Sequence, residues 1–491
     1  MRPAWLLLAL LAACSAPEPR PAQDRPNIVY LLADDLGYGD LSCLNKDSKI
    51  ATPNMDRLAS QGMIFTDAHS GSAVCTPTRY GILTGRYAWR TRLQQGVLDG
   101  YSPALIDPKR LTVASMLRRQ GYHTACIGKW HLGFQWAGTK ENVDYARPIR
   151  NGPTDAGFDT YYGISASLDM PPYVWIENDR AVGIPTATKT WIRTGPAHPD
   201  FEAVDVLPTI TRKSIDYLDQ RAKETRPFFL YVPLNAPHTP IVPSPEFAGK
   251  SGLGAYGDFV LQVDAAVGEI LKTLDRNGQA GNTLVILTSD NGCSPSAGYP
   301  ALAKLGHNPS HTFRGTKADI FEGGHRIPFL VRWPGKIRAG SRCDDTICLT
   351  DLMATCAAFL DVALPDDAGE DSVNLLPAFF GTSTGPLREA TVHHSINGSF
   401  AIRQWNWKLE LCADSGGWSE PRPGKADVTK LPAVQLYDLA LDGGERKNVQ
   451  ADHPEVVERL SRLLQQYVDR GRSTPGAPQK NDTSVAIRKP R

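Results

Sequence analysis

Short, uninterrupted apolar runs alternate with helical patterns along the first two thirds of this 491-residue chain. A strand that is buried on both faces of a sheet reads as such a run, and four are evident: 28–32, 123–127, 228–232 and 283–287. Helical patterns lie between them at 52–62, 111–120 and 260–274. The alternation predicts an α/β fold with a large, mostly parallel sheet and helices on both faces.

The pattern changes after residue 375, where Pro, Gly, Ser and Thr become frequent. Short strand-like runs at 400–403, 407–411 and 435–438 then precede a helical pattern at 454–468. We expect a main domain over residues 25–380 and a smaller α+β domain with a short antiparallel sheet over 381–473. Residues 474–491 are expected to be a disordered tail.

The N-terminus resembles an export signal. A positive charge at Arg2 precedes a short apolar run, which is too short for a membrane span of roughly 20 residues. Leu11-Ala12-Ala13-Cys14 resembles a bacterial lipobox, so Cys14 is expected to carry a lipid that anchors the protein to a periplasmic or outer-membrane surface. The alternative is an ordinary secretory signal cleaved near Ala13 or Ala16. Residues 15–24 read as a tether.

Charge and cysteine content bear on two questions: whether the protein binds nucleic acid and whether disulfides stabilise it. The formal net charge is +1 without any basic block, which argues against a nucleic-acid partner. Nine cysteines are few for this length, so disulfides are not the main source of stability. Cys343 and Cys348 lie close in sequence, but the pairing cannot be read from spacing.

Polar side chains follow all four proposed strands, at the edge where ligands bind in open α/β sheets. They are Asp34, Asp35, Lys129, His131, His238, Asp290 and Asn291. Three carboxylates and an amide suit a hard divalent cation, and a loose oxygen cage suits Ca²⁺ more readily than Mg²⁺. No spacing typical of zinc ligands is present. Alone, the Asp34-Asp35 pair would equally fit a turn or a helix cap.

Cys75 opens the segment Cys75-Thr-Pro-Thr-Arg79, which reads as the start of a helix. An exported cysteine is commonly a disulfide partner or a small buried apolar residue. The positive end of a helix instead favours an anionic group, and Arg79 lies one turn along, within reach of an oxygen on residue 75. A thiolate would also be stabilised there, so position alone leaves the chemistry open.

Several ordered motifs together resemble the sulfatase family. Cys75-x-Pro-x-Arg79 continues to Leu83-Thr84-Gly85, and Gly128-Lys-Trp-His-Leu-Gly133 resembles the second family signature. The paired Asp34-Asp35, the segments around His238 and Asp290, and Arg314-Gly-Thr-Lys317 follow in the family's order. The resemblance runs from about residue 27 to 334, and implies an alkaline phosphatase-like fold.

The resemblance also implies a mechanism. A separate maturation enzyme would oxidise Cys75 to formylglycine (3-oxoalanine), whose hydrated gem-diol attacks sulfur. Ca²⁺ would be held by Asp34, Asp35, residue 75, Asp290 and Asn291. Arg79 would orient the diol, and Lys129 and Lys317 would bind sulfate oxygens. His131 would act as the base, and His238, with or without Lys317, as the acid for the leaving alcohol.

Substrate recognition is less constrained. His311, His325 and His393 are expected on loops over the cleft, with surface loops that have no substrate role as the alternative. Residues 169–175 form a second candidate loop. A sulfated carbohydrate is expected as substrate because an exported lipoprotein meets extracellular polymers. The rival functions are a phosphonate or phosphodiester hydrolase of the same superfamily and an inactive glycan-binding lipoprotein.

Overall fold

A computed structural model describes residues 25–489. The expectations for Cys14 and the N-terminal signal therefore fall outside the described residues. No helix among residues 25–489 is long and apolar enough to cross a membrane.

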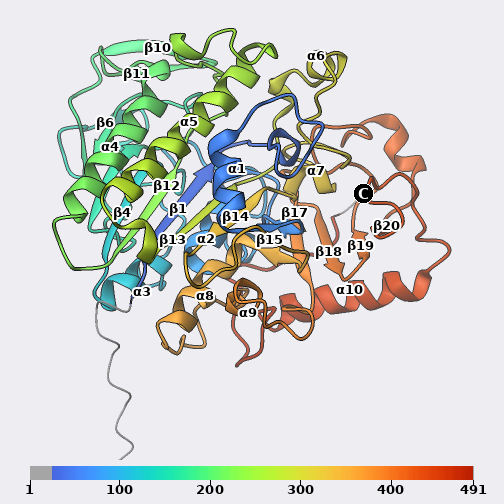
Figure 1. Ribbon diagram of the computed structural model, residues 1–491. Helices are drawn as coiled ribbons and strands as arrows, with labels where there is room; N and C mark the ends of the chain where they lie inside the picture. Colours follow the sequence, from blue (N-terminus) through green and yellow to red (C-terminus); the bar gives the residue numbers. More distant parts are fainter. Residues whose placement is uncertain (1–24, 490–491) are drawn as a thin grey trace, which may run out of the picture.

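The main domain is built on a ten-stranded sheet (Figure 1). Its five central strands are parallel and run in the order β13 (Thr283–Ser289), β1 (Asn27–Ala33), β12 (Phe228–Pro233), β4 (His123–Lys129) and β7 (Thr160–Ile164). Four of these are the strands that the apolar runs predict. Antiparallel pairings occur on both flanks, through β14 (Phe329–Arg332) with β2 (Met63–Phe65), and β8 (Ile176–Glu177) with β9 (Arg180–Ala181). β15 (Ser341–Cys343) pairs parallel with β2 and forms one edge of the sheet. The sheet is therefore mixed, with a parallel centre and antiparallel pairings on both sides of it.

Helices cover both faces of this sheet, as expected. Alternate residues of β1 face opposite sides, so Val29 and Leu31 join one core cluster while Tyr30 joins the other. The Val29 side packs against α1 (Pro53–Ser60), α4 (Val206–Arg221) and α5 (Gly254–Arg276). The Tyr30 side packs against α2 (Cys75–Thr84), α3 (Val113–Arg119) and α8 (Leu352–Phe359). This double covering is why the β1 run has no polar alternation.

The C-terminal part has its own antiparallel sheet, in orange to red beside the main sheet (Figure 1). Its strands run in the order β17 (Thr391–His394), β18 (Phe400–Gln404), β19 (Trp407–Glu410) and β20 (Gln435–Asp438). Helix α10 (Pro454–Asp469) packs on one face through Leu460 and Leu464. The same cluster includes Tyr87 and Trp89 of the main domain, so an apolar contact joins the two parts.

The C-terminal segment differs from the expectation of a disordered tail. Residues 474–489 run back along the protein, where Asn481 Oδ1 accepts a hydrogen bond from Arg90 Nη1 at 2.9 Å. Asp482 pairs with Arg86 Nη2 at 3.0 Å. Both arginine side chains are fully buried, so the tail supplies partners for buried cations. A polar composition does not reveal such partners.

Candidate active site

The polar residues that follow the central strands meet at one edge of the sheet. Asp34 and Asp35 follow β1, Asp290 follows β13, and Lys129 ends β4. Main-chain bonds hold these strand ends in register, since Asp34 N donates to Ala236 O at 3.0 Å and Asp290 N donates to Ala33 O at 3.1 Å. All of these side chains are almost fully buried. The strand-end rule therefore predicted which residues lie together.

Cys75 is the first residue of α2 and faces this edge. Its Sγ lies 3.6 Å from Asp34 Oδ1 and 3.4 Å from Lys317 Nζ. Lys317 reaches the site because its main-chain N–H donates to Cys293 O at 2.9 Å, which fixes its loop beside β13. Burial raises the pKa of the Cys75 thiol, with the nearby Asp34 carboxylate adding to the effect. An unmodified Cys75 is therefore a neutral thiol and a weak nucleophile.

Arg79 lies one helical turn after Cys75, between two carboxylates. Its Nη2 contacts Asp34 Oδ2 at 3.0 Å and Asp290 Oδ2 at 2.8 Å, and its Nη1 donates to Lys129 O at 2.9 Å. Burial would raise the pKa of Asp34, but Lys129, His238 and Arg79 hold it well below its usual range. The pKa of Asp290 is instead raised to about 6 by burial and by the charge of Asp34. The site thus packs three carboxylates against three cations, Arg79, Lys129 and Lys317, and the local balance decides the direction in which each pKa moves.

Side chains that could hold a divalent cation gather at this edge. Asp34, Asp35, Cys75 and His238 each place a ligand atom within 4.8 Å of the others. Asn291 Nδ2 donates to Asp35 Oδ1 at 2.7 Å, which leaves Asn291 Oδ1 buried without a hydrogen-bond partner in the described chain. A buried carbonyl oxygen without a partner is costly unless an ion or water satisfies it. Carboxylate oxygens and this amide oxygen fit a hard cation.

Two histidines flank the cage in different tautomers, which their hydrogen bonds assign. His131 Nε2 donates to Leu98 O at 2.7 Å, so its Nδ1 is the unprotonated nitrogen, and Nδ1 is buried without a partner among the described residues. His238 Nδ1 donates to Thr239 O at 2.6 Å, and its Nε2 lies 3.7 Å from Asp35 Oδ2. Burial, followed by Lys317, lowers the pKa of His238 to about 3. Burial and then Lys129 lower the pKa of His131 well below its usual value.

The backbone around the site is held in uncommon conformations. Asp35 and His131 have φ of 66° and 57°, in the left-handed region that non-glycine residues rarely adopt. Gly128 allows β4 to approach β12, because a Cβ there would lie 2.0 Å from Pro233 O. Such conformations persist where the surrounding structure enforces them and are common at active sites.

The substrate prediction is wrong for His325 and His393. Both side chains are fully buried, in a cluster with His69 where the C-terminal sheet meets the main domain, rather than on loops over the cleft. His311 is half-buried and contacts the rings of Tyr38 and Phe313. A single sequence does not reveal that β17, an edge strand of the C-terminal sheet, has all of its side chains buried.

Other polar residues at this edge were missed by the sequence reasoning. Asn235 follows β12, and neither polar atom of its side chain has a hydrogen-bond partner among the described residues. Ser165 follows β7 and lies beside His131. The main-chain N–H of His131 donates to the main-chain Ser165 O at 2.9 Å. The hydroxyl of Ser165 and that of Ser167 are likewise buried and unpartnered in the described chain. The rule that identified Asp34 and Asp290 would have identified Asn235, which follows a predicted strand; Ser165 follows β7, which the apolar runs do not predict.

Comparison with known proteins agrees with this geometry. A family model described as Sulfatase matches residues 26–362. An N-acetylgalactosamine-6-O-sulfatase from Bacteroides thetaiotaomicron is 36% identical over 93% of this chain and 96% of that protein. Human arylsulfatase A is 32% identical over 94% of this chain and 90% of that protein.

Solved structures show the same relationship. A Bacteroides thetaiotaomicron structure from work on the metabolism of multiple glycosaminoglycans has a TM-score of 0.80 at 36% identity, covering 90% of this chain and 99% of that one. The phosphonate monoester hydrolase of Agrobacterium radiobacter shares the fold, with a TM-score of 0.59 at 21% identity, covering 90% of this chain and 95% of that one. The match over most of the chain and the clustering of the motif residues lead to one conclusion: this protein belongs to the sulfatase family and is a sulfuric ester hydrolase.

Proposed function

We propose that the protein removes 6-O-sulfate from N-acetylgalactosamine residues of sulfated glycosaminoglycans, using a formylglycine formed from Cys75. The observation that carries the mechanism is the position of Cys75, at the N-terminus of α2 and in contact with both Asp34 and Lys317. The substrate assignment rests on the relatives, since one 36% identical over nearly the whole chain is named for this sugar and position. The family comparison favours a sulfatase over the phosphonate hydrolase, which shares only the fold.

The residues around Cys75 suit attack on a sulfate ester. After conversion by a maturation enzyme and hydration, residue 75 carries two hydroxyls; one attacks sulfur as the S–O bond to the sugar breaks, and the other later expels sulfate and restores the aldehyde. Lys129 and Lys317 bind sulfate oxygens, and Arg79 orients residue 75. His131, with its free Nδ1, takes the proton from the second hydroxyl.

His238 protonates the leaving alcohol through Nε2, because its Nδ1–H is committed to Thr239 O. Its low pKa in the free site comes from burial and from Lys317, and a bound sulfate anion beside Lys317 offsets that charge and raises the pKa. The proton is thus acquired once substrate has bound.

Ca²⁺ would be held by Asp34, Asp35, residue 75, Asp290 and Asn291. When bound, it neutralises part of the charge that develops on the sulfate oxygens. The unpartnered Asn291 Oδ1 supports this assignment.

Export as a lipoprotein anchored at Cys14 is proposed from the N-terminal sequence alone. It would place the enzyme at a periplasmic or outer-membrane surface, where extracellular sulfated polymers arrive.

The decisive experiment uses protein from a host that supplies the maturation enzyme, with conversion of Cys75 verified by peptide mass spectrometry. N-acetylgalactosamine 6-sulfate, its 4-sulfate isomer and N-acetylglucosamine 6-sulfate are compared by sulfate release, together with aryl phosphate monoesters and diesters. We expect the first compound to give the highest kcat/KM. Faster turnover of a phosphodiester would favour the rival hydrolase, and binding without turnover of any ester would favour the non-catalytic glycan-binding alternative.

A further inference from the structure

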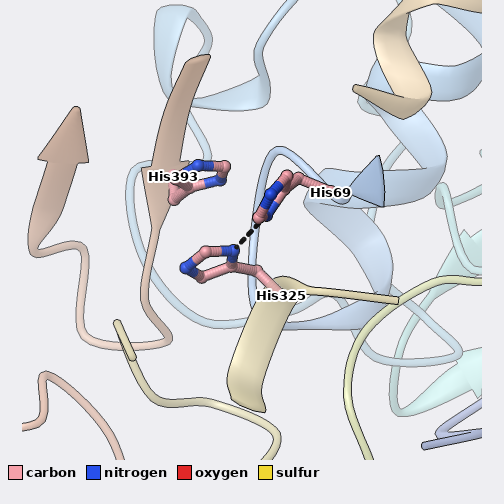
Figure 2. Close-up of side chains that lie close together, drawn as sticks. All are labelled: His69, His325 and His393. Atoms are coloured by element: carbon pink, nitrogen blue, oxygen red, sulfur yellow. Dashed lines mark hydrogen bonds between the residues drawn. The ribbon is translucent and has the colours of Figure 1, made fainter. Parts of the chain in front are cut away.

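Three buried imidazoles gather where the C-terminal sheet meets the main domain (Figure 2). His69 lies on β3 (Ala68–His69), His325 ends α7 (Glu322–His325), and His393 lies on β17. All three are 0% exposed. His69 Nδ1 lies 3.0 Å from His325 Nδ1, and one nitrogen from each ring lies within 4.8 Å of the others. The mechanism above uses none of them.

The outward nitrogens of these rings have acceptors. His69 Nε2 is 2.8 Å from Asp67 Oδ1, His325 Nε2 is 3.1 Å from Ile320 O, and His393 Nδ1 is 3.2 Å from Ser70 O. Histidines that bind a metal generally donate their second N–H to a carboxylate or a main-chain carbonyl, which fixes the ring. His69 and His325 have such an acceptor, but Arg403 Nη1 also lies 2.9 Å from His69 Nε2 and Lys408 Nζ lies 3.0 Å from His325 Nε2, so both cations must shift toward their carboxylate partners when these Nε2 atoms carry protons.

The contact between the two Nδ1 atoms fits one metal ion. Two neutral imidazoles can meet at 3.0 Å only if one Nδ1 carries a proton that the other accepts. If His325 moves that proton to Nε2, where Ile320 O accepts it, both Nδ1 lone pairs become free. Metal–nitrogen bonds of about 2.0–2.1 Å would span this separation. His393 Nε2 now contacts Thr391 Oγ1 at 3.1 Å, and its ring stacks on His325 with 3.8 Å between the ring centres. His393 completes the set only if its ring rotates, which gives up the contact of its Nδ1 with Ser70 O.

The surrounding charges leave room for a cation. Lys408 Nζ contacts His325 Nε2 at 3.0 Å, but it also pairs with Glu445 at 2.6 Å and Glu322 at 3.2 Å, so it remains neutralised if His325 changes tautomer. Asp67 adds a further carboxylate behind His69, which it shares with Arg403 at 2.6 Å and Arg326 at 3.3 Å. Neutral nitrogen ligands suit a borderline ion such as Zn²⁺, whereas Ca²⁺ prefers oxygen.

We propose that His69, His325 and His393 bind one Zn²⁺ ion, which ties β17 of the C-terminal sheet to β3 and α7 of the main domain. Three protein nitrogens leave one tetrahedral position for a water molecule. This site is independent of the sulfatase chemistry and of the cation cage at Asp34.

The first test uses the unaltered full-length protein, stripped with a chelator and then held in excess Ca²⁺ to fill the catalytic cage. Calorimetric titration with Zn²⁺ is expected to show one equivalent per chain, and X-ray absorption at the zinc edge to show imidazole nitrogens in the first shell. Absence of stoichiometric binding, or a shell of oxygens alone, would overturn the proposal.

Variants then assign the ligands. His69→Gln and His393→Gln should each weaken Zn²⁺ binding at least about tenfold, and should abolish the Zn²⁺-dependent rise of the thermal midpoint. His394→Gln is the matched control, because His394 is the next residue of β17, is equally buried, and faces the opposite side of the strand. Retained binding in His393→Gln, or an equal loss in His394→Gln, would refute the three-imidazole site. Loss with His69→Gln alone would move the ion to the neighbouring group Asp67, His69 and Glu322 and also overturn it.

Discussion

Lys408 offers a sharp test of how the C-terminal sheet is stabilised. Its ammonium is fully buried and contacts three carboxylates, Glu445 at 2.6 Å, Glu322 at 3.2 Å and Glu410 at 3.4 Å. Both carboxylate oxygens of Glu410 lack a hydrogen-bond partner within the described chain. The substitution Lys408→Met keeps the apolar stem and removes the charge. It leaves buried carboxylates without their shared cation.

The expected cost follows from this geometry. Removing one partner of a buried ion pair typically costs about 3–5 kcal/mol. With an unfolding entropy of about 2.1 cal/mol/K per residue, a cooperative transition of the 491-residue chain shifts by about 1 °C per kcal/mol. We therefore expect the thermal midpoint of Lys408→Met to fall by about 3–5 °C, with a matching shift in urea unfolding at 25 °C.

The cost should also depend on pH. Burial raises the pKa of both Glu410 and Glu445, and loss of the ammonium raises each further. The folded variant then binds a proton that the unfolded chain releases above the ordinary glutamate pKa, so its stability falls as pH rises. The deficit should grow from pH 5 to pH 8, by at most about 1.4 kcal/mol per pH unit for one proton.

Lys430→Met is the control, because Lys430 forms an exposed ion pair with Asp427 at 2.9 Å. Such surface changes usually stay within about 0.5 kcal/mol. Urea midpoints followed by circular dichroism at pH 5 and pH 8 measure both variants. If Lys408→Met is no less stable than Lys430→Met, or if its deficit shrinks at higher pH, the reasoning about buried charge is refuted.

Three further predictions concern catalysis. Cys75→Ala should abolish sulfate release while the circular dichroism spectrum and thermal midpoint stay close to those of the parent, because one small buried side chain replaces another; residual turnover would remove Cys75 as the nucleophile precursor. His238→Gln should lower kcat on N-acetylgalactosamine 6-sulfate by about 10²–10⁴-fold. It should lower kcat on 4-nitrophenyl sulfate less than tenfold, because nitrophenolate leaves without a proton. Equal losses of kcat on the two substrates would exclude an acid role for His238. Chelation should abolish activity and Ca²⁺ should restore it better than Mg²⁺, with atomic absorption verifying removal; full activity in metal-free protein would contradict the cation cage around Asp34.

The catalytic edge could be predicted from the sequence because it depends on local patterns. A continuous apolar run fixes a strand buried on both faces, and the residue after that run must then lie at the carboxyl edge. Asp34 and Asp290 follow from this rule, and their meeting at one guanidinium requires only that β1 and β13 be neighbours. Arg79 follows because it lies one turn from Cys75 on a helix that the segment itself specifies.

The imidazole cluster depends on contacts that no local pattern encodes. His69, His325 and His393 come from β3, α7 and β17, and they meet only because the C-terminal sheet docks with β17 inward. The same docking buries Lys408 and its carboxylates, in strands whose alternating polar residues would suggest a solvent-exposed face. The face of β19 that carries Lys408 is polar because it packs against other charged side chains, among them Glu322 of α7. A polar alternation in a short strand therefore indicates either solvent or a second charged layer, and the partner layer decides between them.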